Sequence, residues 1–168
     1  MKFNFYALRA IYLHEMDRFR RTLLQSLLSP VLSTSLYFIV FGSVIGDYVE
    51  SIDGLSYGSY IVPGLLMLTL LTQSISNTSF GIFFPKFNGT IYEILAAPIS
   101  TFEVVLAFVG AGATKTLIVG VVIFITSLFF VDVTVKYPLL MIFLLVLVAF
   151  TFALFGFLIG LMSSNFEQ

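Results

Sequence analysis

The sequence predicts an all-α, polytopic membrane helix bundle, and composition, hydropathy and charge distribution are the three observations that predict it. Of the 168 residues, 59% are hydrophobic and only 10% are charged, whereas about a quarter of an ordinary globular domain is charged. Five of the eight Lys and Arg residues precede Thr22, and short basic segments stay in the cytoplasm. Four apolar stretches approach or exceed the ~20 residues that cross a bilayer. They are 22–46, 59–84, 104–130 and 138–162.

The charged N-terminal segment, residues 3–18, predicts a helix that lies on the cytoplasmic membrane surface in contact with lipid. Apolar side chains recur at three- and four-residue steps, while Arg9, Glu15 and Arg18 point away from that stripe. The stripe comprises Phe3, Tyr6, Ala7, Ala10, Leu13 and, at its end, Asp17. A frayed, charged N-terminus is the alternative interpretation. The segment lacks an apolar core of signal-peptide length, so we expect no cleaved signal.

The first two spans, 22–46 and 59–84, differ in polarity. The first contains Pro30, which a membrane helix tolerates because neighbouring groups satisfy the carbonyl that proline leaves free. The loop 47–58 carries acidic but no basic residues, so we expect it outside the cell. The second span becomes polar towards its end, and this polar face is expected to point into the bundle. Its polar residues are Gln73, Ser74, Ser76, Asn77, Thr78 and Ser79.

The segment 85–103 carries two consecutive helix-start patterns. Each has the spacing of a capping box, in which a hydroxyl and a carboxylate satisfy each other's backbone amides. The two pairs are Thr90 with Glu93 and Ser100 with Glu103. Pro98 separates the pairs. We therefore predict a short cytoplasmic helix at about 91–97, followed by a turn and then the third span.

The last two spans, 104–130 and 138–162, carry small residues that let helices approach closely. In the fourth span, Gly156 and Gly160 have small-xxx-small spacing. The small residues of the third span are Ala107, Gly110, Ala111, Gly112, Ala113 and Thr114. We expect a packed face on each span and a tight external hairpin at 131–137 between them.

Residues that carry enzyme chemistry are scarce in this chain. It has no Cys, its only histidine is His14, and no glycine-rich loop ends in Lys-Ser or Lys-Thr. We therefore expect no catalytic, cofactor-binding or metal-ligating residues, and any ATP hydrolysis must take place in a partner. The net charge of −1 also argues against nucleic acid as a partner.

Lys115 lies inside the third apolar span and has two interpretations. Its ammonium would lie roughly one turn inside the cytoplasmic boundary, from where it can snorkel to the surface. Alternatively, it lines a substrate path or pairs across the bundle, as intramembrane charges often do. Gln73 and Asn77 are similarly either interhelical hydrogen-bonding groups or substrate contacts. These three are the candidate pathway or bundle-polar residues.

Several segments, taken in order, resemble the permease subunit of ABC-2 type exporters. They are Pro30 with Leu36-Tyr37-Phe38 and Phe41-Gly42, then Tyr60-Ile61-Val62-Pro63-Gly64-Leu65, then Thr90-Ile91-Tyr92-Glu93-Ile94-Leu95-Ala96-Ala97-Pro98. The resemblance implies a six-helix bacterial inner-membrane subunit that dimerises with a second permease copy and binds two copies of a separate ABC ATPase, which uses the ATP. It also implies that 90–98 is the coupling helix. The ATPase-coupling residues would be Thr90, Tyr92, Glu93 and Pro98.

Members of that family continue for two more spans, so the chain resembles the first two-thirds of a permease. Two other classes are compatible with the residues: a secondary transporter or channel that uses Lys115, Asn77 and Gln73, and a scaffold subunit that transports nothing. An intramembrane enzyme fits poorly for want of an acid–base pair or metal cluster. The substrate is not indicated, because permeases that resemble one another carry lipids, glycans, drugs or ions.

Overall fold

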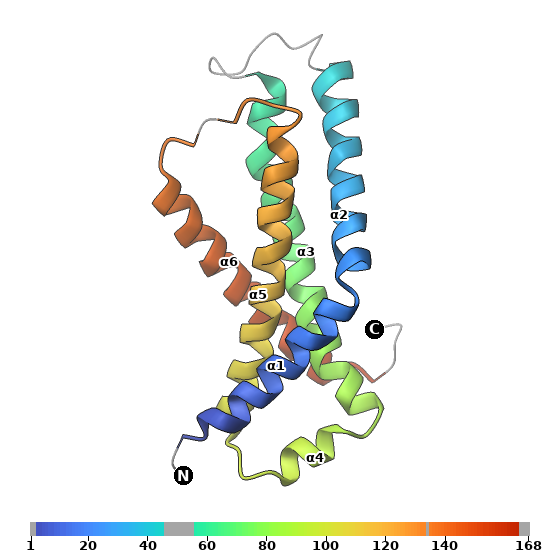
Figure 1. Ribbon diagram of the computed structural model, residues 1–168, viewed down its shortest axis with the longest axis vertical. Helices are drawn as coiled ribbons and strands as arrows, with labels where there is room; N and C mark the ends of the chain where they lie inside the picture. The colour runs from blue at the N-terminus through green and yellow to red at the C-terminus, as the bar shows by residue number, and fades with distance from the viewer. Residues whose placement is uncertain (1–2, 46–55, 134, 165–168) are drawn as a thin grey trace.

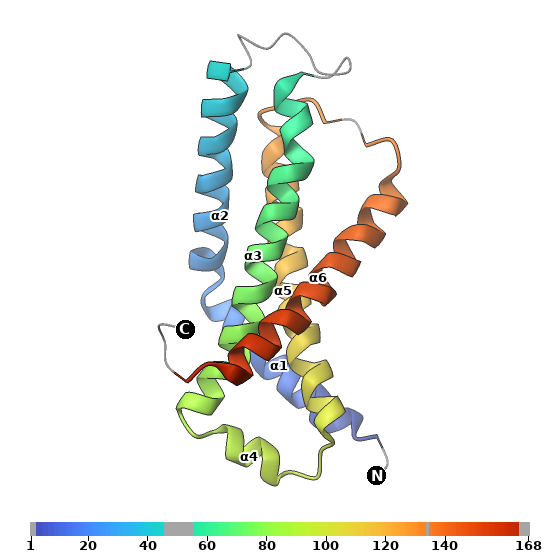
Figure 2. The same ribbon diagram turned by 180° about the vertical axis from the view of Figure 1, so that it is seen from behind.

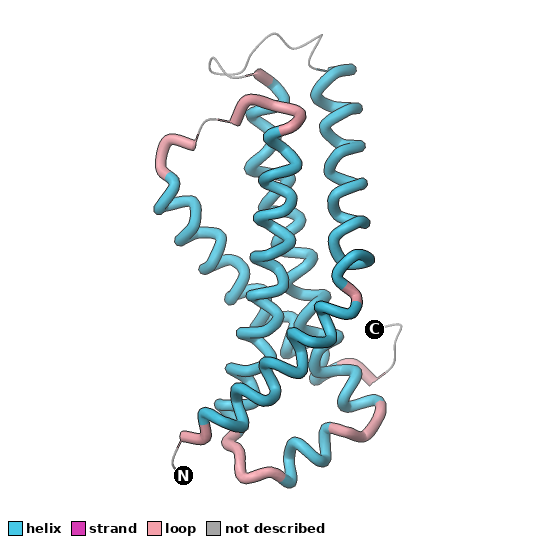
Figure 3. The backbone as a smooth tube through the Cα atoms, viewed as in Figure 1, coloured by secondary structure: helices cyan, strands magenta, loops and turns pink. Residues whose placement is uncertain are grey.

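A computed structural model describes residues 3–45, 56–133 and 135–164, which are helical without strands (Figures 1 and 3). Four helices are long and apolar enough to cross a membrane. The elements are α1 (Phe5–Arg21), α2 (Leu23–Tyr37) with its π-helical continuation (Phe38–Ile45), α3 (Tyr57–Phe87), α4 (Ile91–Ala96), α5 (Thr101–Leu128) and α6 (Pro138–Met162). The all-α membrane bundle predicted from the sequence is confirmed.

The long helices are not all parallel to one another. Helices α2, α3 and α5 extend along the long axis, whereas α6 crosses α3 near one end and tilts away from it at the other (Figures 1 and 2). Helix α1 crosses α5 near the end of the bundle that also carries α4, and the start of α1 and the end of α6 lie towards this end. We call it the α4 end.

Small residues set the close packing of α3 against α5 and α6. A methyl group built on Gly156 of α6 would lie 2.5 Å from the carbonyl oxygen of Ile75, and one on Gly160 would lie 2.6 Å from that of Ser79. On α5, Gly112 faces the Thr78 side chain of α3 so closely that a methyl group would overlap it. The small-residue faces predicted from the sequence are therefore packed faces, as expected for helices that associate in a membrane.

The polar end of the second span divides between two environments. Ser74 and Thr78 are buried, as expected for a face that points into the bundle, and Gly112 of α5 packs against Thr78. Gln73 and Asn77 are only half-buried, and Ser76 is exposed. The prediction that all of these residues point into the bundle was therefore wrong for Ser76.

The helix starts near residue 90 and residue 100 differ. The capping box of Ser100 and Glu103 is present at the start of α5. The predicted box of Thr90 and Glu93 is wrong, because the Thr90 hydroxyl donates to the carbonyl oxygen of Pro85 at 3.3 Å instead of capping α4. The Thr90 backbone is already helical, whereas a capping residue normally has an extended backbone. Most of the predicted loop 47–58 lies outside the described residues.

Candidate functional site

Helix α4 rests on the bundle through one apolar face and exposes the other. Ile91 and Ile94 pack against the buried core, as i and i+3 residues of one helix face can. Tyr92 and Leu95 are 73% and 65% exposed, and Glu93 is exposed as well. No residue of α4 is fully buried, and its outward face is open to a partner. Thr90 and Pro98, at its two flanks, are also exposed.

The start of α1 is tied to the connection between α4 and α5. The Asn4 side-chain amide donates to the carbonyl oxygen of Pro98 at 3.3 Å, and the Asn4 backbone N–H donates to Glu103. The second carboxylate oxygen of Glu103 accepts from the Ser100 backbone at 2.7 Å. Glu103 thus joins α1 to the beginning of α5, because its two oxygens serve backbone amides from different segments.

A buried ion pair joins α1 to α5 further along. The Lys115 ammonium lies 2.8 Å from Glu15 Oε2, and the two side chains are 4% and 2% exposed. Arg18 lies 2.8 Å from the same oxygen. Nearby, the Tyr12 hydroxyl donates to Thr114 Oγ1 at 3.0 Å. Of the interpretations that the sequence leaves open for Lys115, the structure therefore supports pairing across the bundle.

Glu15 is not among the site residues predicted from the sequence, because the pattern places it with the charges that point away from the apolar stripe of an interfacial helix. The structure buries it at 2% exposure, because Tyr12, Glu15 and Phe19 share the face of α1 that packs on α5. The i, i+3, i+7 spacing of an aromatic, an acid and an aromatic residue was the available signal. Conversely, Tyr6 and Leu13 of the predicted apolar stripe are exposed at 84% and 45%, as contact with lipid requires.

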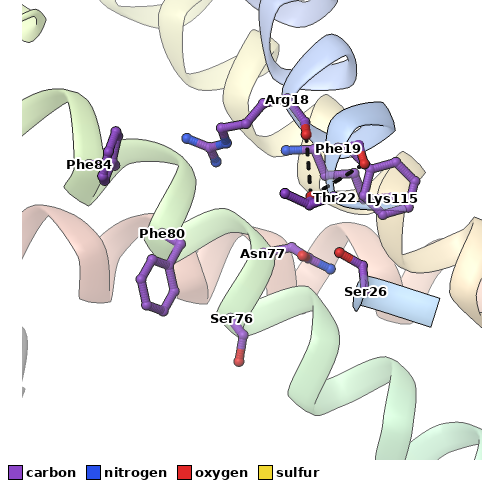
Figure 4. A pocket seen from close by; sticks show the side chains of 9 residues that line it. All are labelled: Arg18, Phe19, Thr22, Ser26, Ser76, Asn77, Phe80, Phe84 and Lys115. Atoms are coloured by element: carbon purple, nitrogen blue, oxygen red, sulfur yellow. Dashed lines mark hydrogen bonds between the residues drawn. The ribbon is translucent and has the colours of Figure 1, made fainter. Parts of the chain in front are cut away.

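Two of the candidate pathway residues lie at one groove, which α1, α2, α3 and α5 line together (Figure 4). Asn77 and Lys115 both contribute to its wall. Gln73 is one turn away on α3 and accepts a hydrogen bond from the Asn77 amide at 3.4 Å. The coupling candidates on α4 are not part of this groove. Among the described residues, no group of three His, Asp or Glu side chains is placed to hold a metal ion.

The structure packs an N-terminal helix across long apolar helices and places a short exposed helix between the second and third spans. The sequence model of the ABC-2 type transporter family matches residues 6–168, and the chain belongs to that family.

Curated relatives place it among transport permeases. It is 38% identical over 162 residues to the protein named inner membrane transport permease YadH of Escherichia coli strain K12, and equally similar to its counterparts in Escherichia coli O157:H7 and Shigella flexneri. The alignment covers 96% of this chain but 63% of those relatives. The chain thus spans less than two-thirds of their length. No solved structure gives a significant match.

Proposed function

We propose that the chain is part of the transmembrane permease subunit of an ABC-2 type exporter and that α4 is the helix through which a separate ATPase acts on it. The observation that carries this proposal is the exposed face of α4, which presents Tyr92, Glu93 and Leu95 at the end of a membrane bundle. Aromatic side chains are enriched at protein docking surfaces, and polar groups surround them at the rim. The family to which the chain belongs supports the nature of the partner.

Movement of α4 would be transmitted to the membrane helices through short connections. Residues 88–90 connect α4 to α3, and residues 97–100 connect it to α5. The bonds from Asn4 to Pro98 and Glu103 add a third route, through α1 to α2. Closure of the ATPase dimer on ATP would therefore tilt α3 and α5 together with α1. No catalytic residue of the permease is needed, because the ATPase only shifts the population between inward- and outward-open states.

The proposal includes an orientation and an assembly. The basic N-terminal segment supports placing α1, α4 and both described ends in the cytoplasm of a bacterial cell, with the chain in its inner membrane. Two permease copies would form the substrate pathway at their interface and bind two ATPase copies. Lys115 is better explained as the partner of Glu15 than as the lining of an open path, since its side chain is 4% exposed. Asn77 and Gln73, half-buried, are the candidate pathway contacts that stay accessible.

Copurification of the ATPase tests the docking surface. We expect the double substitution Tyr92→Ala and Glu93→Ala to abolish capture of a candidate P-loop ATPase by the permease, without loss of membrane insertion. The matched control is Tyr137→Ala with Asp132→Ala, which removes an exposed tyrosine and an exposed carboxylate from the opposite end of the bundle. Undiminished capture by the α4 variant, or equal loss in both variants, would contradict the assignment.

A further inference from the structure

The groove at the junction of α1 and α2 combines cationic, polar and aromatic side chains. It has a volume of about 340 Å³. Its lining residues are Arg18, Phe19, Thr22, Ser26, Ser76, Asn77, Phe80, Phe84 and Lys115. In Figure 4 the guanidinium of Arg18 extends towards α3, and the Ser26 hydroxyl and the Asn77 amide lie across from each other. This combination needs an explanation, because the docking and packing described above do not use it.

The charges around the groove do not cancel. Two cations, Arg18 and Lys115, share one oxygen of one carboxylate, Glu15, so the three groups together carry a formal charge of +1. Lys115 is too buried to meet a ligand directly, but Arg18 has a 30% exposed side chain. A guanidinium has five N–H donors, and Glu15 is the partner that the described structure gives it. Arg18 therefore has both the charge and the donors to bind an anion.

The rest of the groove adds hydrogen-bond donors and aromatic rings to this cation. Ser26 and the Asn77 amide provide further hydrogen-bond donors near the cation. Beyond them, Phe80 and Phe84 are 56% and 45% exposed, although they lie in a helix that is apolar enough to span a membrane. Phe80 and Phe84 follow Asn77 along α3 towards the α4 end, so the rings line the groove on that side and the polar donors line it on the side of the membrane centre.

The depth of the groove agrees with a lipid headgroup. Arg18 lies five residues before Leu23, where the first membrane span begins, so it stands at the boundary between the hydrocarbon and the headgroups. Basic residues at this level attract anionic lipids by about 1 kcal/mol each. A phosphodiester headgroup with one negative charge would neutralise the +1 of the cluster.

We propose that this groove is a binding site for an anionic phospholipid of the leaflet at the α4 end. Its phosphate contacts Arg18, with Ser26 and Asn77 as additional donors, and its acyl chains extend from there towards the middle of the membrane, away from the α4 end. The bound lipid would join α1, α2 and α3 at the point where the interfacial helix turns into the first span. The site requires only that the chain lies in a membrane, so its test does not depend on whether an ATPase binds α4.

The absence of tryptophan from the chain allows a direct test. Phe80→Trp places a single fluorescent reporter in the groove, and Phe155→Trp places one on the exposed surface of α6. Both proteins are reconstituted in phosphatidylcholine vesicles that contain a tenth of either brominated phosphatidylglycerol or brominated phosphatidylcholine as a quencher. We expect the groove reporter to show a roughly fivefold preference for the anionic quencher, which is the ratio that about 1 kcal/mol provides, and the α6 reporter to show little.

Charge variants complete the test. Arg18→Gln should abolish the preference of the groove reporter, Arg18→Lys should retain most of it, and Arg20→Gln, which removes an exposed charge two residues away, should leave it nearly unchanged. Equal quenching by both lipids in the protein that carries only the groove reporter, or equal loss in the Arg18→Gln and Arg20→Gln variants, would overturn the proposal. Displacement of the brominated lipid by millimolar inorganic phosphate would assign the groove to soluble anions and would also overturn it.

Discussion

Removal of one partner from the ion pair of Glu15 and Lys115 tests whether the N-terminal helix is joined to the bundle as described. At 2.8 Å, the attraction between the two charges is about 6 kcal/mol at an effective dielectric constant of ~20, before the cost of desolvation is subtracted. Glu15→Gln leaves the Lys115 ammonium buried without a carboxylate, which should cost about 3–5 kcal/mol of unfolding free energy. Lys115→Met should cost less, about 1.5–3 kcal/mol, because Arg18 still pairs with Glu15.

The double variant leaves neither charge buried, so the two losses should not add. We expect a coupling free energy of at least about 1.5 kcal/mol, measured by reversible unfolding in mixed micelles with increasing dodecyl sulfate. Asp17→Asn is the control, since it removes an exposed carboxylate from the same helix and should change stability by less than about 0.5 kcal/mol. Losses that add within about 0.5 kcal/mol would refute the pairing.

Three further predictions concern the packing, the topology and α4. Gly156→Ala should destabilise the bundle by about 1–3 kcal/mol in the same unfolding assay, because the new methyl group overlaps the Ile75 backbone, whereas Gly64→Ala meets no atom within 4 Å and should be tolerated. Single cysteines at Ser56 and Asn88 should differ in intact cells: an impermeant maleimide should label Ser56 and not Asn88, and the reverse pattern would exclude a cytoplasmic N-terminus. Thr90→Ala should cost less than the roughly 1 kcal/mol of a lost helix cap, because the Thr90 hydroxyl does not cap α4 and makes only an exposed 3.3 Å hydrogen bond to Pro85; a larger loss of stability would contradict the structure.

The span positions could be predicted from the sequence because hydropathy is a local property. The fourth span, 138–162, coincides with α6, which begins at a proline and is the most hydrophobic of the four. The second span was predicted to end at residue 84, before Pro85, but α3 continues to Phe87. A proline removes one donor without preventing the next turn, and the Asn88 backbone N–H still donates to the Phe84 carbonyl oxygen at 3.0 Å.

The ion pair could not be predicted in the same way. Glu15 and Lys115 are separated by 100 positions, and the local pattern of α1 favours an outward position for every charge. Only the packing of α1 on α5 shows that the Glu15 carboxylate is buried between these two helices. The short helix at 91–97 was predicted correctly in position although one of its two capping patterns was not, because the turns on either side of it limit where it can form.

Photo-crosslinking from α4 tests the central claim most directly, namely that this helix meets the ATPase. A benzoylphenylalanine introduced at Tyr92, which is 73% exposed, should form an adduct with the P-loop ATPase when cells that contain both proteins are irradiated. The same residue at Tyr137, 65% exposed at the opposite end of the bundle, should form none. An ATPase adduct from Tyr137, or none from a fully inserted Tyr92 variant, would contradict the account.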